Sequence, residues 1–331
     1  MDGPSGSGTQ AVERKVGGVF RERLTNIIWE YGTLIGLLVL VVFFSTMSDA
    51  FLRFGNIVNI LRQISMLAII ATGLTFCMVT GDFDLGIGSI GSIAGVMTVS
   101  LLVRGVPTII SVLAGLGVAA LFGLANAVLV TRVGISSFIS TLAAGSVATG
   151  VTFLYTQGQA IYAQLPPAFE FIGRGYVGII PAPVIIMALI VALGQFVLSR
   201  TRTGRYMHAI GGNITAARLS GIAVSKYRGL GLLFSSLGAG AAGIILASRL
   251  GSGQPTAASG FFLDAISAAF LGQTVLRDGR PSVIGTFIGV LIIGVINNGL
   301  TLLGVSYYWQ DISKGIIIVL AVTLATLRPK H

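Results

Sequence analysis

The sequence predicts an all-α membrane protein that crosses the bilayer about ten times. Its 331 residues are 54% hydrophobic and only 10% charged, whereas soluble domains carry roughly 25% charged residues. Several apolar runs reach or approach the ~17–25 residues that a helix needs to cross the hydrocarbon core. Lipid offers the backbone no hydrogen-bond partners, so such runs are expected to be helical. The alternating pattern typical of a membrane barrel is absent from the sequence.

The predicted spans follow one another closely. Five are expected in the first half, at 31–47, 64–80, 85–103, 106–130 and 136–154. Five are expected in the second half, at 183–198, 229–247, 261–275, 282–303 and 312–327. The eighth and tenth are short enough to be re-entrant pieces or parts of a neighbour. A count of nine or eleven therefore stays open.

The chain is predicted to form a single membrane domain, residues 29–327, between two tails. The N-terminal tail, residues 1–28, starts with the polar, Gly/Ser-rich stretch MDGPSGSGTQAV, so part of it is expected to be disordered. No small-residue cleavage site follows the first apolar run, and we expect this run to be retained rather than removed as a signal peptide. Residues 328–331 form the C-terminal tail.

The basic residues predict the orientation in the membrane. Most of the 21 Lys and Arg residues lie in the tails and in loops on the same side as the tails. Lys and Arg gather on the cytoplasmic side of membrane proteins, so both termini and the loop 199–228 are predicted to be cytoplasmic. The large loop 156–182 is then extracytoplasmic. The same rule accounts for the net charge of +10, and no nucleic-acid partner is expected.

Several chemistries lack the residues that they need. No lysine stands between a Gly-rich run and a Ser or Thr, so the chain has no phosphate-binding P-loop and is not expected to hydrolyse ATP. GIGSIG at 86–91 matches a dinucleotide-binding pattern, but it opens a membrane helix without a preceding strand. His208 and His331 both lie outside the spans. We therefore expect neither an enzyme nor a metal or cofactor bound by this chain.

The polar residues within the spans are mostly neutral. All acidic residues lie in loops or near span ends, whereas carriers driven by ion gradients usually place ionisable groups at mid-membrane. Three amides are predicted to line a path for a neutral polar solute, with hydrogen bonding between helices as the alternative. These amides are Asn126, Asn297 and Asn298.

Three aspartates are predicted to act as structural turn residues, because each lies on a short polar turn just before a helix. A carboxylate at a helix start accepts hydrogen bonds from backbone N–H groups and is favoured by the helix dipole. These residues are Asp82, Asp84 and Asp278. For Asp82 and Asp84, direct contact with the solute is the alternative.

The loop 199–228 is predicted to contain a short helix at 213–221. Asn213 is suited to cap its N-terminus, and Gly221 is suited to end it. A helix of about two turns is unstable alone in water, so the adjoining spans and a partner are expected to hold it. Its predicted contact residues are Ala216, Ala217, Arg218 and Leu219. The alternative is an inert basic loop.

The motif GRYMHAIGGNITAARLSGI at 204–222 resembles the cytoplasmic loop of monosaccharide-type ABC importer permeases, the ribose/xylose/arabinose class. Other segments resemble the same family in the same order along the chain. They are MVTGDFDLGIGSIGSIAGV, FISTLAAGSVATGV, ASGFFLDAISAAFLGQTVL and GTFIGVLIIGVINNGL. The agreement extends from about Phe51 to Thr326, and several motifs in the same order make it specific for the family.

The resemblance implies a type II ABC importer-like permease fold in the bacterial cytoplasmic membrane. The chain would form the pathway for a ribose- or xylose-like monosaccharide and pair with a second copy or a paralogous permease. An ATPase that binds ATP-Mg would serve it from the cytoplasm, and a sugar-binding protein from outside. The 213–221 helix would be the coupling helix that docks on the ATPase.

Departures from the family pattern, among them the segment GQTVLRDGRPSV in place of a more glycine-rich turn, leave the solute open. Thr215 stands where an acidic residue often precedes the Ala-Ala pair, and Asp82 stands where Gly is usual. Another small polar solute is therefore an alternative: a sugar-like signal, a polyol, a nucleoside or a branched-chain amino acid. An autonomous secondary carrier is a further alternative.

Overall fold

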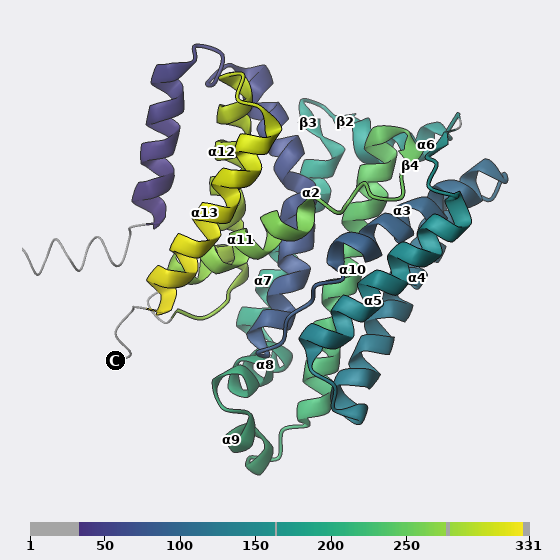
Figure 1. Cartoon of the computed structure of the whole chain (residues 1–331), viewed down its shortest axis with the longest axis vertical. Coiled ribbons are helices and arrows are strands. Elements are labelled where there is room, and N and C mark those ends of the chain that lie inside the picture. Colours follow the sequence, from purple (N-terminus) through teal and green to yellow (C-terminus); the bar gives the residue numbers. More distant parts are fainter. Residues whose placement is uncertain (1–32, 163, 276–278, 327–331) are drawn as a thin grey trace, which may run out of the picture.

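The structure is a computed structural model that describes residues 33–162, 164–275 and 279–326 (Figure 1). Both predicted tails and Asp278 lie outside these residues. A helical segment, Thr33–Met47, comes first. The main helices that follow are α2 (Phe54–Val79), α3 (Ile87–Val103), α4 (Thr108–Val128), α5 (Ser137–Thr156), α7 (Ala182–Arg200), α10 (Val224–Leu250), α11 (Phe261–Val275), α12 (Val283–Leu302) and α13 (Tyr307–Thr326).

The helices agree with the predicted membrane class. Within the described residues, six helices are long and apolar enough to cross a bilayer, and three further apolar helices are shorter. Each of the ten predicted segments overlaps a helix, but this finding does not establish ten spans. The prediction placed the start of the second segment ten residues too late, because Arg62 and Gln63 interrupt the apolar run there. The helix nevertheless continues through them from Phe54.

Two helices, α2 and α10, form the centre of the domain. In their most apolar stretches 67% of α2 and 72% of α10 is buried, against 28% for α7 and 22% for α4 with its π-helical extension η1 (Leu129–Val133). Helices α4 and α7 carry exposed large apolar side chains such as Ile109, Leu121 and Leu189. Such faces suit contact with lipid chains, and α2 and α10 supply the packed interior (Figure 1).

Glycines bring α10 against α3 and α2 at backbone distance. A Cβ atom on Gly95 of α3 would lie 2.8 Å from the carbonyl oxygen of Gly243 on α10. On α2, a Cβ atom on Gly73 would lie 2.8 Å from the carbonyl oxygen of Phe234 on α10. Small residues at such contacts let membrane helices pack closely and gain van der Waals energy.

Replacing Gly243 by alanine is expected to destabilise the protein, because its Cβ would overlap the carbonyl oxygen of Gly91 on α3. Overpacking of this kind costs ~1–3 kcal/mol, and we expect a lower thermal midpoint in detergent by several degrees. Gly117→Ala is the matched control, since a Cβ there meets nothing within 4 Å. An equal midpoint for both variants would contradict the close contact.

The two ends of the molecule carry different loop structures (Figure 1). One end holds α8 (Arg202–Gly212) and α9 (Ile214–Leu219). The other holds α6 (Pro167–Arg174) and four two-residue strands. Strand β1 (Ile161–Tyr162) pairs antiparallel with β4 (Ser252–Gly253), and β2 (Tyr176–Val177) pairs antiparallel with β3 (Ile180–Pro181). The loop predicted to be extracytoplasmic therefore folds back onto the helix ends.

Candidate translocation and coupling sites

The loop between α7 and α10 folds into two short helices. Thr201 caps α8, where its Oγ1 atom accepts a hydrogen bond of 3.3 Å from the Gly204 amide. Asn213 caps α9, where its Oδ1 atom accepts a hydrogen bond of 2.9 Å from the Ala216 amide. Gly221 follows α9 with φ +78°, a left-handed conformation that favours glycine. The local sequence rules thus fix both ends of α9.

The side chains of α9 divide into a buried one and an exposed set. Ala217 is only 4% exposed and packs against Ile210 and Val224. Ala216 and Arg218 are exposed, and Leu219 is 85% exposed. We expected both alanines on the outer face; the structure buries Ala217 and leaves Ala216 outside. One alanine therefore anchors α9 to its own chain, and the outer face is available to a partner.

Asp82 forms a buried ion pair between the end of α2 and the start of α10. Its Oδ2 atom accepts a 2.9 Å hydrogen bond from Arg228 Nε, and its Oδ1 atom accepts a 2.6 Å hydrogen bond from Arg228 Nη2. Asp82 is 1% exposed. A two-point contact fixes the geometry of both side chains as well as their charge. Sequence reasoning missed this partner, because 146 residues separate the two.

Asp84 lies in the segment that joins α2 to α3. Its Oδ1 atom accepts a 2.9 Å hydrogen bond from the Gly86 amide, at the start of α3, as a turn residue would. The amides of the same segment donate to hydroxyl groups of α5: Phe83 N to Ser137 Oγ at 3.2 Å, and Leu85 N to Thr141 Oγ1 at 3.0 Å. These contacts satisfy a non-helical backbone between two apolar helices.

All three amides predicted to line a path make hydrogen bonds between helices. Asn126 Oδ1 accepts from Ser140 Oγ at 2.8 Å. Asn297 Nδ2 donates to Asp264 Oδ2 at 3.3 Å, and Asn298 exchanges two 2.9 Å hydrogen bonds with Asn56. This arrangement matches the alternative that the sequence left open. Contact of these amides with a solute stays a prediction.

Comparison with known proteins identifies the family of the chain. Residues 56–322 match the family described as "Branched-chain amino acid transport system / permease component". The chain belongs to this permease family.

The permease also has curated relatives along nearly its whole length. It is 40% identical to the ribose import permease protein RbsC of Bacillus subtilis over 92% of this chain and 95% of the relative. It is 41% identical to RbsC of Escherichia coli K12 over 89% and 93%. It is 34% identical to the D-allose transport system permease protein AlsC of the same strain over 92% and 94%. No solved structure matches the permease.

These findings confirm the resemblance that the motifs indicated. The permease is a transport component, and its apolar helices place it in a membrane. The site residues that sequence reasoning missed are partners of predicted ones: Arg228, Asn56 and Ser140. Asn56 lies near the start of α2, eight residues before the predicted span. A helix prediction that continued through Arg62 would have placed Asn56 within a span and raised the question of its partner.

Replacing Asn298 by leucine is expected to lower the thermal midpoint of the permease, because Asn56 would lose its amide partner. Hydrogen bonds between membrane helices contribute about 0.6 kcal/mol on average. The double variant Asn56→Leu/Asn298→Leu should recover part of the loss, since neither amide is then unpaired. Thermal midpoints and solute uptake are measured together. Reduced uptake with an unchanged midpoint would instead favour a role of Asn298 in the path.

Proposed function

We propose that the permease forms the translocation path for a monosaccharide, with ribose as the first candidate, in an ABC importer. The observation that carries this proposal is the similarity of 40–41% to two permeases named for ribose import, over about nine-tenths of the chain. A third relative is named for D-allose. Together these names point to a neutral, hydroxyl-rich solute rather than to an ion.

The polar groups of the spans support a neutral solute. Hydroxyl and amide groups are buried between the helices, as in the 2.8 Å contact between Thr75 of α2 and Thr286 of α12. Such groups exchange hydrogen bonds with sugar hydroxyls without a net charge in the membrane. In this proposal two permease copies, or the permease and a paralogue, enclose the path between them.

The remaining parts of the importer are separate proteins in this proposal. A cytoplasmic ATPase with bound ATP-Mg supplies the energy, because the sequence has no P-loop of its own. It docks on the exposed face of α9, and a sugar-binding protein delivers solute at the end that carries α6. Both termini and α8–α9 lie in the cytoplasm, and the membrane is the bacterial cytoplasmic membrane.

Reconstitution in proteoliposomes tests the proposal. The permease is incorporated with its ATPase and sugar-binding protein, and uptake of labelled ribose is measured with and without ATP inside. We expect ATP-dependent uptake, with competition by unlabelled ribose. Uptake by the permease alone would identify an autonomous carrier. Competition by leucine or by a nucleoside, but not by ribose, would replace the sugar with another solute class.

A further inference from the structure

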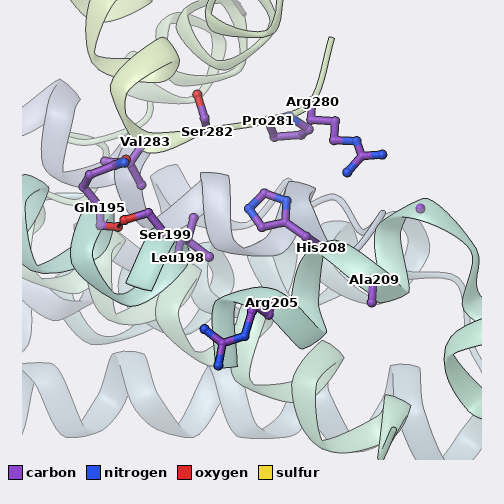
Figure 2. A pocket seen from close by; sticks show the side chains of 11 residues that line it. Gln195, Leu198, Ser199, Arg205, His208, Ala209, Arg280, Pro281, Ser282 and Val283 are labelled. Carbon is purple, nitrogen blue, oxygen red and sulfur yellow. Dashed lines mark hydrogen bonds between the residues drawn. The ribbon is translucent and has the colours of Figure 1, made fainter. Parts of the chain in front are cut away.

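A cavity of about 620 Å³ opens against the loop 199–228. Its walls come from the end of α7, from α8 and from the start of α12 (Figure 2). A volume of this size lies within the range typical of small-molecule sites. The cavity therefore has room for a ligand and involves none of the amides or aspartates discussed above.

The cavity wall is basic. Arg205 and His208 come from α8, and Arg280 lies in the segment before α12 (Figure 2). In the part of the chain that the structure describes, neither Arg205 nor Arg280 has an ion-pair partner. Burial lowers the pKa of His208, and the positive charge of Arg280 lowers it further. The positive charges of Arg280 and protonated His208 repel each other. An anion in the cavity would offset this repulsion and favour the charged form of His208.

The remaining wall adds neutral donors. Ser282 caps α12, where its Oγ atom accepts a 3.1 Å hydrogen bond from the Gly285 amide. Its hydroxyl proton can donate to a ligand, and the N-terminus of the 20-residue α12 also favours negative charge. Ser199 and Gln195 line the side that α7 forms. Guanidinium groups and hydroxyls are typical partners of phosphate oxygens.

We propose that this cavity binds a phosphate group, carried either by an anionic phospholipid of the inner leaflet or by a soluble phosphate ester. The volume exceeds that of one phosphate and leaves room for the glycerol or sugar to which it is esterified. Basic pockets between helices at the cytoplasmic side are suited to lipid headgroups. A bound phosphate would bridge α8 to α12, next to α9.

Purified full-length permease in nanodiscs tests this proposal with two probes. The first arm compares phosphatidylglycerol with phosphatidylcholine nanodiscs and measures retained lipid by native mass spectrometry. The second arm titrates inorganic phosphate and glycerol 3-phosphate into phosphatidylcholine nanodiscs and measures the thermal midpoint. Retention of phosphatidylglycerol alone identifies the lipid source, and a shift with soluble phosphates alone identifies the soluble source.

Arg205→Gln/Arg280→Gln is expected to weaken binding of the active probe by about tenfold or more, because two charge-assisted contacts are lost. Arg202→Gln is the matched control, since Arg202 is an exposed arginine of α8 that does not line the cavity. If the double variant does not purify, Arg280→Gln and the charge-retaining Arg280→Lys supply the comparison. Binding by the glutamine variants at wild-type strength, or binding of neither probe to the wild type, would overturn the proposal.

Discussion

Replacing Leu219 by glutamate is expected to abolish ATP-driven uptake while the permease still inserts into the membrane. Leu219 is 85% exposed at the end of α9, so its side chain is accessible to a partner. In the proposed importer it is buried against the ATPase, where a carboxylate would be desolvated without a partner. Co-purification of the ATPase and uptake by proteoliposomes are the measurements.

Leu219→Met is the matched control, because methionine keeps an apolar side chain of similar size. It should retain the ATPase and most of the uptake. Gly221→Pro tests the shape of α9 instead of its surface. Proline cannot adopt the φ of +78° found at this position, and it lacks the amide that donates to Arg218 O at 3.0 Å. Normal ATPase recovery and normal uptake in both Leu219→Glu and Gly221→Pro would contradict a coupling role for α9. They would favour the alternative of an inert basic loop.

Ala217→Trp is expected to disturb the loop from within. Ala217 packs against Ile210 and Val224, so an indole there would push α9 away from its own chain. Loss of the ATPase in this variant would therefore report a displaced helix and not a blocked groove. The pair Ala217→Trp and Leu219→Glu separates the inner support of α9 from its outer contact.

Removing Arg228 should destabilise the permease more than any other single charge change considered. Arg228→Gln leaves the carboxylate of Asp82 buried without its partner, and breaking a buried pair in this way costs ~3–5 kcal/mol. We expect a strong fall in the thermal midpoint and in the yield of monodisperse protein. Asp82→Asn/Arg228→Gln should recover much of this loss, because no buried charge is left unpaired.

The exposed pair between Glu170 and Arg174 provides the control for that experiment. Its atoms are 3.8 Å apart and both side chains are more than 40% exposed, so solvent screens the interaction. Glu170→Gln should therefore leave the thermal midpoint almost unchanged. Equal effects of Arg228→Gln and Glu170→Gln would contradict the assignment of Asp82 and Arg228 as a buried structural pair.

The sequence predicted features that depend on neighbouring residues. Asn213 and Gly221 lie at the two ends of α9, because a cap and a left-handed glycine act within a few residues of their own helix. The apolar runs predicted the helices for the same local reason. The predicted start of the second span was wrong. The apolar run is interrupted at Arg62, but the helix continues through this residue.

Features that depend on packing between distant segments were beyond sequence reasoning. Asn298 and Asn56 are 242 residues apart, and Asp82 and Arg228 are 146 residues apart. Nothing local selects one partner over another until the helices are placed side by side. The cavity beside α8 was missed for the same reason, because its two arginines come from segments on either side of three intervening helices.

The glycine contacts along α10 have a mechanical consequence. Where backbone touches backbone, as between Gly243 and α3 or between Gly73 and α10, no side chain lies between the helices to change rotamer and absorb a displacement. Helices α2, α3 and α10 should therefore shift as one rigid body. Ala217 of α9 packs against Val224, the first residue of α10. A force on α9 would therefore act on the group of α2, α3 and α10 at the N-terminal end of α10. We therefore expect a displacement of α9 to be transmitted along α10 to the opposite end of the domain.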